Sequence, residues 1–325
     1  MTQELPALVV GCGAVGSQYD EGRAGDLPLS HAGAYRAHEA TRLDAGVDPD
    51  PDARRRFEEH WGVPCYPELD AALTEHQPTI ISVCTPFETH LAVVDQALGA
   101  GARALWVEKP LATTHSEGKK MVAACARAGA ALQVNFLRRF DPFHQSVAKI
   151  LDNTTAPLLH ADFRFSGNLR DFGSHAFDLF RWFTGEPGWV RAVRLPTGEP
   201  VVLLGAPSGV TASFTRVPAE SIELFECYLF TSERMLSLAG LGEHLLTAEA
   251  KPSVLFRDVL RLSKPVVSSG GLEHAMIEGV DSLVSHLKSD TPLLCDGADG
   301  LAALAIQEAA EESLARQDFV PMGAA

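Results

Sequence analysis

Short apolar runs alternate with helix-like stretches over the first part of the chain. Each run is four to six residues long and most end at glycine, proline or a charged residue, as buried parallel strands do; the runs span 6–10, 43–47, 79–84, 104–107 and 133–136. The helix-like stretches between them span 53–61, 69–75, 89–98 and 115–128. Strands that alternate with helices predict an α/β domain built on a doubly wound parallel sheet with both faces covered.

The pattern changes to period-two alternation from about residue 157. Strands separated by turn residues are expected over 158–165, 190–195, 201–204, 210–215 and 222–230. Because few helices intervene, we expect a large, mostly antiparallel open sheet in an α+β domain. Helices are expected over 174–183, 275–288 and 297–315.

Length and charge narrow the classes of protein. A chain of 325 residues exceeds the usual size of one core, so two domains are expected. We place their boundary near 130–145 and assign 1–134 and 135–325 to them, with the helix over about 297–315 a candidate to pack back on the first. The net charge of −15 disfavours nucleic-acid and membrane partners, because such a surface repels phosphate. A small-molecule partner fits better.

The cysteine pattern favours a reducing compartment. The six cysteines are scattered without a Cys-x-x-Cys pair, and three of them (Cys12, Cys84 and Cys125) lie in apolar runs. We interpret them as reduced and buried rather than as a disulfide framework. The chain shows neither a secretory leader pattern nor an apolar run long enough to cross a bilayer, so a cytoplasmic location is expected. No His/Cys cluster has the spacing of metal ligands, so no metal is expected.

A glycine motif follows the first strand directly. It reads Gly11-Cys12-Gly13-Ala14-Val15-Gly16. In a dinucleotide-binding loop the first glycine allows the tight turn, the second lets the backbone approach a pyrophosphate, and the third lets helix and strand pack closely. The motif alone could be a plain glycine turn, but its place after a strand and before a βα pattern favours a dinucleotide-binding domain over 1–134.

An acidic residue ends the second strand, where a carboxylate would bind the adenosine ribose. This residue is Asp48, thirty-two positions after Gly16, whereas the usual spacing is about 20. An extra segment, roughly Gln18–Ser30, accounts for the difference. A carboxylate repels a 2′-phosphate, so NAD is favoured; the run Arg54-Arg55-Arg56 could hold that phosphate and keeps NADP open, although a solvated first helical turn explains the run better.

Two further motifs follow strands and so fall at the carboxyl edge of the sheet, where open α/β folds bind ligands. They are Cys84-Thr85-Pro86-x-x-x-His90 and Glu108-Lys109-Pro110. A lysine at that edge can be desolvated, which suits a proton donor or acceptor; the alternative is a surface lysine. Pro110 is a candidate for a cis peptide.

A fourth motif begins the helix expected near residue 174. Asp171, His175 and Asp178 share one helical face if Asp171 starts the helix. A carboxylate beside a histidine can orient the ring for proton transfer. The alternative is that Asp171 caps the helix and His175 is a core residue.

Together and in this order, the four motifs resemble the glucose–fructose oxidoreductase / inositol dehydrogenase / MocA (Gfo/Idh/MocA) family. The run 134–142, Val-Asn-Phe-Leu-Arg-Arg-Phe-Asp-Pro, is also similar to that family's strand-to-helix junction. The resemblance implies a Rossmann-type first domain and a substrate-binding and oligomerisation domain behind it. It also implies catalytic roles for Lys109, Asp171 and His175. The implied cofactor-binding residues are Gly11, Cys12, Gly13, Ala14, Val15, Gly16, Asp48, Thr85, Pro86, His90, Glu108 and Lys109.

The implied reaction is hydride transfer between nicotinamide and a secondary alcohol or ketone of a sugar, polyol or sugar derivative. One alternative is a ketoreductase for a nucleotide-linked sugar or an antibiotic-biosynthesis intermediate. A different class is a regulatory protein that senses dinucleotide without chemistry, which the joint presence of Lys109, Asp171 and His175 disfavours.

Two expectations depend on features outside the motifs. In the resembling family the open sheet face pairs subunits, so a homodimer or homotetramer is expected. The segment Gln18–Ser30 departs from the family pattern and could reach the cofactor or wall the substrate pocket. His31, which follows it, could contact substrate, but a structural role is favoured.

Overall fold

The computed structural model describes residues 4–23, 25–219 and 221–323. Its internal contacts divide the chain into two compact units. The first unit runs to Asp141 and includes Glu273–Leu304; the second comprises Pro142–Leu272 and the residues from Ala305 on. The assignment of dinucleotide binding to 1–134 and substrate binding to 135–325 concerns function and stays a prediction. None of the helices in the described ranges is sufficiently long and apolar to span a membrane.

The first unit contains the expected parallel sheet. Its strand order is β3-β2-β1-β4-β5-β6, and every pairing is parallel. This is the order of dinucleotide-binding folds, with the topological switch between β1 and β4. The strands are β1 (Leu5–Val10), β2 (Thr41–Val47), β3 (Cys65–Tyr66), β4 (Ile80–Val83), β5 (Ala104–Val107) and β6 (Ala131–Val134).

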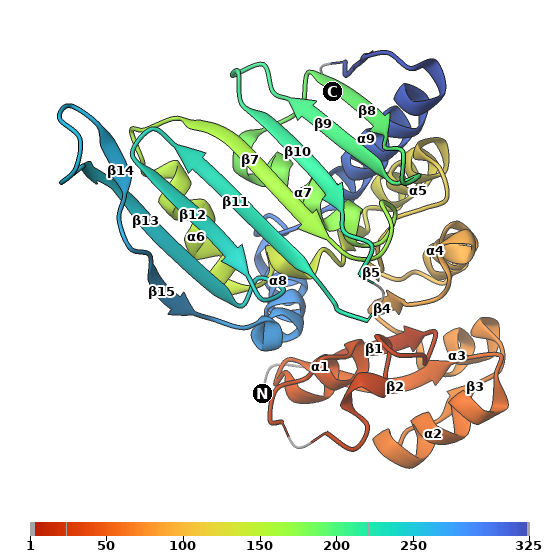
Figure 1. Cartoon of the computed structure of the whole chain (residues 1–325). Coiled ribbons are helices and arrows are strands. Elements are labelled where there is room, and N and C mark those ends of the chain that lie inside the picture. The colour runs from red at the N-terminus through yellow and green to blue at the C-terminus, as the bar shows by residue number, and fades with distance from the viewer. Residues whose placement is uncertain (1–3, 24, 220, 324–325) are drawn as a thin grey trace. The chain divides into compact units, whose positions relative to one another are not determined.

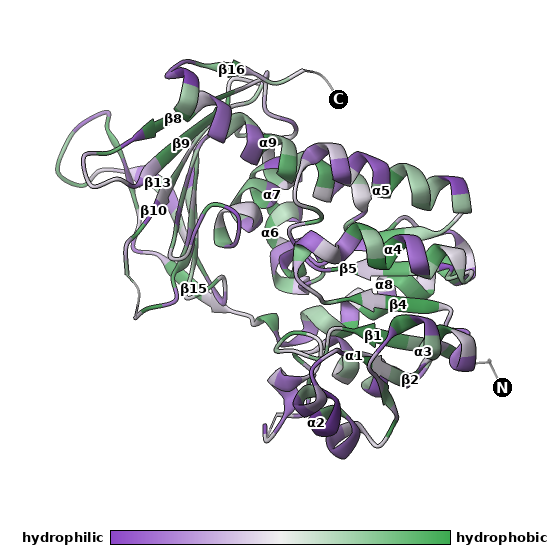
Figure 2. Cartoon of the chain, turned by 90° about the vertical axis from the view of Figure 1, so that its right-hand side faces the viewer, coloured by the Kyte–Doolittle hydropathy of each residue, from purple (hydrophilic) through white to green (hydrophobic). Residues whose placement is uncertain are grey.

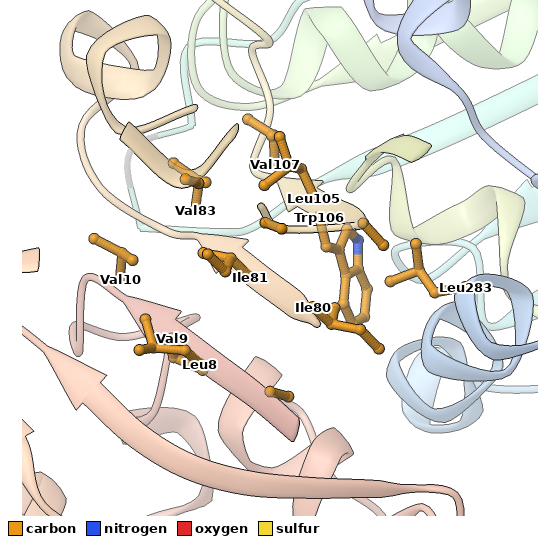
Figure 3. Close-up of a cluster of buried hydrophobic side chains, with 14 of the residues drawn as sticks. Leu8, Val9, Val10, Ile80, Ile81, Val83, Leu105, Trp106, Val107 and Leu283 are labelled. Atoms are coloured by element: carbon orange, nitrogen blue, oxygen red, sulfur yellow. The ribbon is translucent and has the colours of Figure 1, made fainter. Parts of the chain in front are cut away.

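Helices cover both faces of this sheet, which explains why its strands are continuous apolar runs. Figure 3 shows Leu8, Ile80 and Trp106 on neighbouring strands, with Leu283 beside Trp106. The helices α3, α4 and α5 lie in contact in that order, whereas α1 lies against α8. The helices of this unit are α1 (His31–Ala37), α2 (Pro51–Trp61), α3 (Leu69–His76), α4 (His90–Gly99), α5 (His115–Ala128) and α8 (Ala275–Ser289).

The second unit contains a ten-stranded mixed sheet with the order β14-β13-β12-β11-β7-β10-β9-β8-β16, and β15 pairs with β13. Its pairings are antiparallel except that of β7 with β10. The strands are β7 (Leu158–Phe165), β8 (Trp189–Arg194), β9 (Pro200–Gly205), β10 (Thr211–Arg216), β11 (Phe225–Thr231), β12 (Arg234–Ala239), β13 (His244–Pro252), β14 (Leu260–Leu262), β15 (Val266–Ser269) and β16 (Val320–Pro321). The prediction of a mostly antiparallel sheet is confirmed.

One face of this sheet packs against α6 (Pro142–Asp152) and α7 (Phe172–Thr184), as Figures 1 and 2 show. Phenylalanines fill the layer between the sheet and these helices. The rings of Phe163 and Phe214 stack with their centroids 4.8 Å apart, and the ring centroid of Phe177 in α7 lies 5.0 Å from that of Phe214. The last helix, α9 (Gly297–Arg316), begins in the first unit and ends in the second.

Some elements differ from the expectations. The sixth strand occupies Ala131–Val134 rather than 133–136, because the chain turns where the Phe136 N–H donates to Val134 O and then enters a short 3₁₀ turn at Leu137–Arg139. The strand expected from 222 starts at Phe225, and Ile222 is exposed. The short β3, helices α1 and α6, and the strands after Thr231 were not individually expected.

Candidate functional site

The glycine loop has the geometry that its sequence predicts. Gly11 has φ +93°, and a Cβ on it would lie 2.6 Å from the carbonyl oxygen of Cys84. A Cβ on Gly16 would lie 1.9 Å from the carbonyl oxygen of Gly11. A Cβ on Gly13 would meet nothing within 4 Å. Two glycines are therefore required by close backbone packing, whereas the backbone at Gly13 is open to an approaching phosphate.

The helix expected after the loop is interrupted. One turn forms, in which Ser17 N donates to Gly13 O, and the chain then leaves the helical path. It returns at His31, whose backbone N–H donates to Val15 O at 3.0 Å, and Ala32 N donates to Gly16 O at 3.0 Å. In a continuous helix these two carbonyls would accept from residues 19 and 20. The extra segment is thus inserted within the helix that follows the loop, and α1 begins at His31.

The inserted segment is closed by its own hydrogen bonds. The Asp20 carboxylate accepts from Leu29 N at 2.8 Å, Ser30 N at 3.0 Å and the Ser30 hydroxyl. The segment also lines a cavity of about 240 Å³ with His60 and Trp61 at the end of α2. Its predicted contact with cofactor or substrate stays a prediction.

Asp48 is bonded to the glycine loop. Its Oδ2 accepts the backbone N–H of Cys12 at 2.8 Å, and its Oδ1 accepts that of Asp50 at 2.9 Å. Nearby, the Arg54 guanidinium donates to the carbonyl oxygens of Asp48 and Pro49, both at 2.9 Å. Arg55 pairs with Asp52 at 2.9 Å. Two arginines of the Arg54–Arg56 run thus have partners in and around the first turn of α2.

The loop after β4 is supported by a buried histidine. His90 is fully buried, and its Nε2 lies 2.9 Å from Thr85 O while its Nδ1 lies 3.1 Å from Leu111 O. Burial lowers the pKa of His90, against the opposing effect of these carbonyls and of Glu108. The ring therefore joins the loop after β4 to the loop after β5. Thr85 is half-buried and Pro86 exposed, and their predicted contacts with nicotinamide stay predictions.

Lys109 lies at the carboxyl end of β5, between a buried carboxylate and a buried proline. It is half-buried, and its peptide bond to Pro110 is cis. Glu108 is 8% exposed and its Oε2 accepts the Lys109 backbone N–H at 3.3 Å. Its Oε1 accepts from Asn135 Nδ2 and lies 3.0 Å from His31 Nε2. Burial disfavours the charge of Glu108, but the bonds from His31 and Asn135 outweigh it and lower the pKa of the carboxyl.

The sequence did not predict this buried polar network. It also includes Ser82, whose hydroxyl lies 2.7 Å from His31 Nδ1 and 2.7 Å from the Tyr35 hydroxyl. A usable signal existed: Ser82 and Asn135 are polar residues within apolar strand runs, and a buried polar side chain requires a partner. His31 has an exposed fraction of 0% and packs on Trp106 with ring centroids 4.1 Å apart. The structural role favoured for His31 matches these contacts.

In the second unit, Asp171 and His175 lie at the start of α7. Asp171 is the N-cap residue but makes no capping bond with its side chain, so that part of the alternative is wrong, whereas His175 is buried as the alternative expects. Its carboxylate is exposed, and a Cβ on Gly167 would lie 3.8 Å from Asp171 Oδ2. Gly167 also lines a cavity of about 480 Å³ with Ser166 and Arg216. His175 is 5% exposed, with its ring perpendicular to that of Phe225.

The arrangement of the His, Cys, Asp and Glu side chains bears on metal binding and on the state of the thiols. Among residues 4–23, 25–219 and 221–323, no group of three or more His, Cys, Asp or Glu side chains could hold a metal ion. The six cysteines are unbridged, and Cys12 Sγ lies 3.6 Å from Cys65 Sγ.

The strand order of the first unit and the geometry of its glycine loop are those of dinucleotide-binding folds. Residues 6–136 match the model of an oxidoreductase family described by its NAD-binding Rossmann fold. Residues 6–136 belong to this family, Gfo/Idh/MocA, and the chain is an NAD-dependent oxidoreductase.

One curated relative and several solved structures are similar to nearly the whole chain. The chain is 23% identical to the inositol 2-dehydrogenase of Rhizobium meliloti (strain 1021), over 90% of this chain and 96% of the relative. A levoglucosan dehydrogenase in complex with NADH and levoglucosan has a TM-score of 0.82 at 18% identity, over 98% of this chain and 99% of that one. The WlbA dehydrogenase of Bordetella pertussis, in complex with NADH and UDP-GlcNAcA, has a TM-score of 0.78 at 18% identity, over 99% of this chain and 100% of that one.

Proposed function

We propose that the protein oxidises a secondary alcohol of a sugar, polyol or sugar derivative to the ketone, or a hemiacetal to the lactone, reversibly and with NAD. The observation that carries the proposal lies in the first unit. The open backbone at Gly13 and the half-buried Lys109 both lie at the carboxyl edge of one parallel sheet, after β1 and β5. That edge is where this fold binds a dinucleotide and its reaction partner.

The residues of the loop fit a dinucleotide. Gly11 and Gly16 permit the close packing of the loop, Gly13 leaves its backbone accessible, and Asp48 stands beside Cys12 to bind the adenosine ribose. Bound there, NAD supplies the nicotinamide C4 that accepts a hydride from the substrate carbon. The Asp48 carboxylate beside the loop supports NAD over NADP, because a carboxylate repels a 2′-phosphate.

Lys109, Asp171 and His175 are proposed to carry the proton chemistry. As the hydride leaves the carbinol carbon, the hydroxyl proton passes to a base and a C=O bond forms. Lys109 and His175 share the removal of that proton and the stabilisation of the alkoxide, and Asp171 orients the imidazole. In the reverse direction the same groups return the proton to the carbonyl oxygen.

A substrate that carries a nucleotide is the second candidate. The cavity lined by Ser166, Gly167 and Arg216, about 480 Å³ in volume, falls in the range of small-molecule sites. WlbA is a neighbour whose complex contains UDP-GlcNAcA. In this second candidate function, the protein reduces the ketone of a nucleotide-linked sugar or of an antibiotic-biosynthesis intermediate.

The test is the change of nicotinamide absorbance with a panel of sugars, inositols and sugar nucleotides, using NAD(H) and NADP(H) in parallel. Lys109→Ala is the active-site variant, and Lys119→Ala, which removes an exposed lysine of α5, is its matched control. Turnover that only Lys109→Ala loses supports the proposal. Binding of dinucleotide without turnover of any substrate would favour the sensing protein instead.

We also propose that the protein is a homodimer or homotetramer. The sheet face opposite α6 and α7 is uncovered in the second unit, as Figure 2 shows. Exposed apolar side chains of its strands and hairpins include Val193, Val254, Phe256 and Val267. Pairing between copies would remove this surface from water. A monomer by light scattering at micromolar concentration would contradict the proposal.

A cytoplasmic location is proposed from the thiols. Buried Cys12 and Cys65 are unbridged although their sulfur atoms are 3.6 Å apart, as a reducing compartment maintains. Six titratable thiols in freshly isolated, denatured protein are expected. Fractionation of the source cells would test the location directly.

A further inference from the structure

Four buried side chains form one line of hydrogen bonds that ends on Glu108. The Tyr35 and Ser82 hydroxyl oxygens are 2.7 Å apart, Ser82 Oγ is 2.7 Å from His31 Nδ1, and His31 Nε2 is 3.0 Å from Glu108 Oε1. With the imidazole hydrogen on Nε2, each group donates to the next: tyrosine to serine, serine to histidine, histidine to carboxylate. Hydrogen bonds aligned in this way polarise one another, so the line has a defined direction.

Glu108 suits the end of this line only as a carboxylate. Three N–H groups address it: His31 Nε2 and Asn135 Nδ2 at Oε1, and the Lys109 backbone N–H at Oε2. A carboxylate accepts all three, whereas an amide would present an NH₂ group to at least one of the donors. Glu108 is 8% exposed, so an unsatisfied donor beside it would be costly.

His31 also holds the glycine loop. Its backbone N–H donates to Val15 O, and the next residue donates to Gly16 O, both at 3.0 Å. These bonds resume the helix that the inserted segment interrupts. A single residue is therefore bonded through its backbone to the proposed phosphate-binding loop and through its side chain to the residue that precedes Lys109.

We propose that His31 is a positioning residue that couples the glycine loop to Lys109 through the Glu108 carboxylate. The Lys109 backbone N–H donates to Oε2 of Glu108, and His31 Nε2 is hydrogen-bonded to Oε1 of the same carboxylate. When the loop is fixed by a bound dinucleotide, the same hydrogen bonds fix the backbone from which the lysine amine extends. A displacement of about 1 Å at a reacting group can cost two orders of magnitude in rate, so this linkage acts on turnover. The part of this inference that concerns Lys109 rests on the proposed function. The expected effect of His31 on dinucleotide affinity does not.

The test compares two substitutions at His31 of similar bulk. His31→Gln can keep an N–H donor near Oε1 of Glu108, whereas His31→Leu cannot. We expect His31→Leu to lower kcat by at least about tenfold and to weaken NADH binding by at least about threefold. His31→Gln should stay within about threefold of the unaltered protein in both. If the two variants behave alike, the ring contributes only packing and the proposal is wrong.

A double-mutant cycle with Glu108→Gln tests the route of the coupling. Because His31 is proposed to act through the carboxylate, His31→Leu should lower kcat less than about twofold further once residue 108 is glutamine. Fully additive losses would overturn the proposal. The matched control is His38→Leu, at the other end of α1, where the ring accepts from Ala40 N and lies 3.6 Å from Asp281. It should leave kcat and NADH affinity unchanged.

A variant at Ser82 tests the same line of hydrogen bonds if His31→Leu does not fold. Ser82→Ala removes the hydroxyl that donates to His31 Nδ1 and changes the side-chain volume little. We expect it to lower kcat with little change in the KM for the alcohol substrate, and an unchanged kcat would contradict the proposal. If the unaltered protein turns over no substrate, the dehydrogenase function fails while the NADH affinities of the His31 variants still decide the coupling.

Discussion

The Asp48 carboxylate and the backbone N–H of Cys12 form a hydrogen bond of 2.8 Å that joins the end of β2 to the glycine loop. The second oxygen of the carboxylate accepts the N–H of Asp50, so both oxygens have a donor without any ligand. The bond fixes the carboxylate in one orientation beside the loop. A ligand hydroxyl that meets this carboxylate finds a preorganised acceptor.

Replacing Asp48 tests that role. Asp48→Asn offers an NH₂ group to one of the two backbone donors and removes the charge, so NADH affinity is expected to fall about tenfold. The preference for NADH over NADPH should narrow, because the carboxylate that repels a 2′-phosphate is gone. Fluorescence titration with both cofactors measures this. The control is Asp70→Asn at an exposed site of α3; equal effects of the two variants would contradict the assignment.

The glycines of the loop should separate stability from binding. Gly11→Ala forces a Cβ to within 2.6 Å of Cys84 O at φ +93°, so it should destabilise the fold by about 2 kcal/mol or more. Gly13→Ala meets no atom within 4 Å and should leave the melting temperature nearly unchanged. Its methyl group would stand where the backbone approaches phosphate, so NADH binding should weaken more than about tenfold. Calorimetric melting and NADH titration of both variants are the measurements.

His90 should matter through the loops that it joins. His90→Ala removes the group that faces the carbonyls of Thr85 and Leu111, and a buried carbonyl without a partner costs about 1–3 kcal/mol. Urea unfolding should show a loss of that size, and kcat should fall because the loop of Lys109 is no longer tied to that of Thr85. His60→Ala, at an exposed histidine of α2, serves as the control. A stable His90→Ala protein would show that the bridge is dispensable.

Glu108 predicts a specific pH dependence of stability. Its folded-state pKa is lower than the ordinary 4.5, so the unfolded chain binds more protons as the pH falls through that value. The stabilisation from the ionised carboxylate is therefore fully present above pH 4.5 and is lost as the pH falls through the folded pKa. The difference in unfolding free energy between the unaltered protein and Glu108→Gln should shrink toward acid. Urea unfolding from pH 3 to 7 measures it; a difference independent of pH would contradict the prediction, and exposed Glu59→Gln provides the comparison.

Much of the parallel sheet could be predicted because its strands are buried on both faces and are therefore uniformly apolar. β5 of this sheet was predicted at its observed bounds. In the second unit, the alternation of apolar and polar residues predicted β7 at its observed bounds. The parallel pairing of β7 with β10 could not be predicted, since it depends on a long crossover through α7, β8 and β9 rather than on local sequence.

The site was predicted in parts. Glycine spacing and strand ends identified the loop and Lys109, because these positions depend on local backbone chemistry. The partners of Glu108 could not be predicted in this way: His31, Ser82 and Asn135 come from three separate elements, and only the folded sheet brings them to one carboxylate. Asp171 shows the limit of helix rules, because its position is that of a cap but its side chain does not act as one.

The inserted segment has a consequence for how such chains can vary. His31 and Ala32 use the carbonyls of Val15 and Gly16, which residues of an uninterrupted helix would otherwise use. The number of residues between the loop and His31 is therefore independent of the helical register that places the imidazole against Glu108. Segments of quite different length, even with their own binding properties, could be exchanged at this point while the loop, the histidine and the lysine keep their relative positions. The insertion point therefore tolerates segments of different sequence and length without displacing the glycine loop, His31 or Lys109.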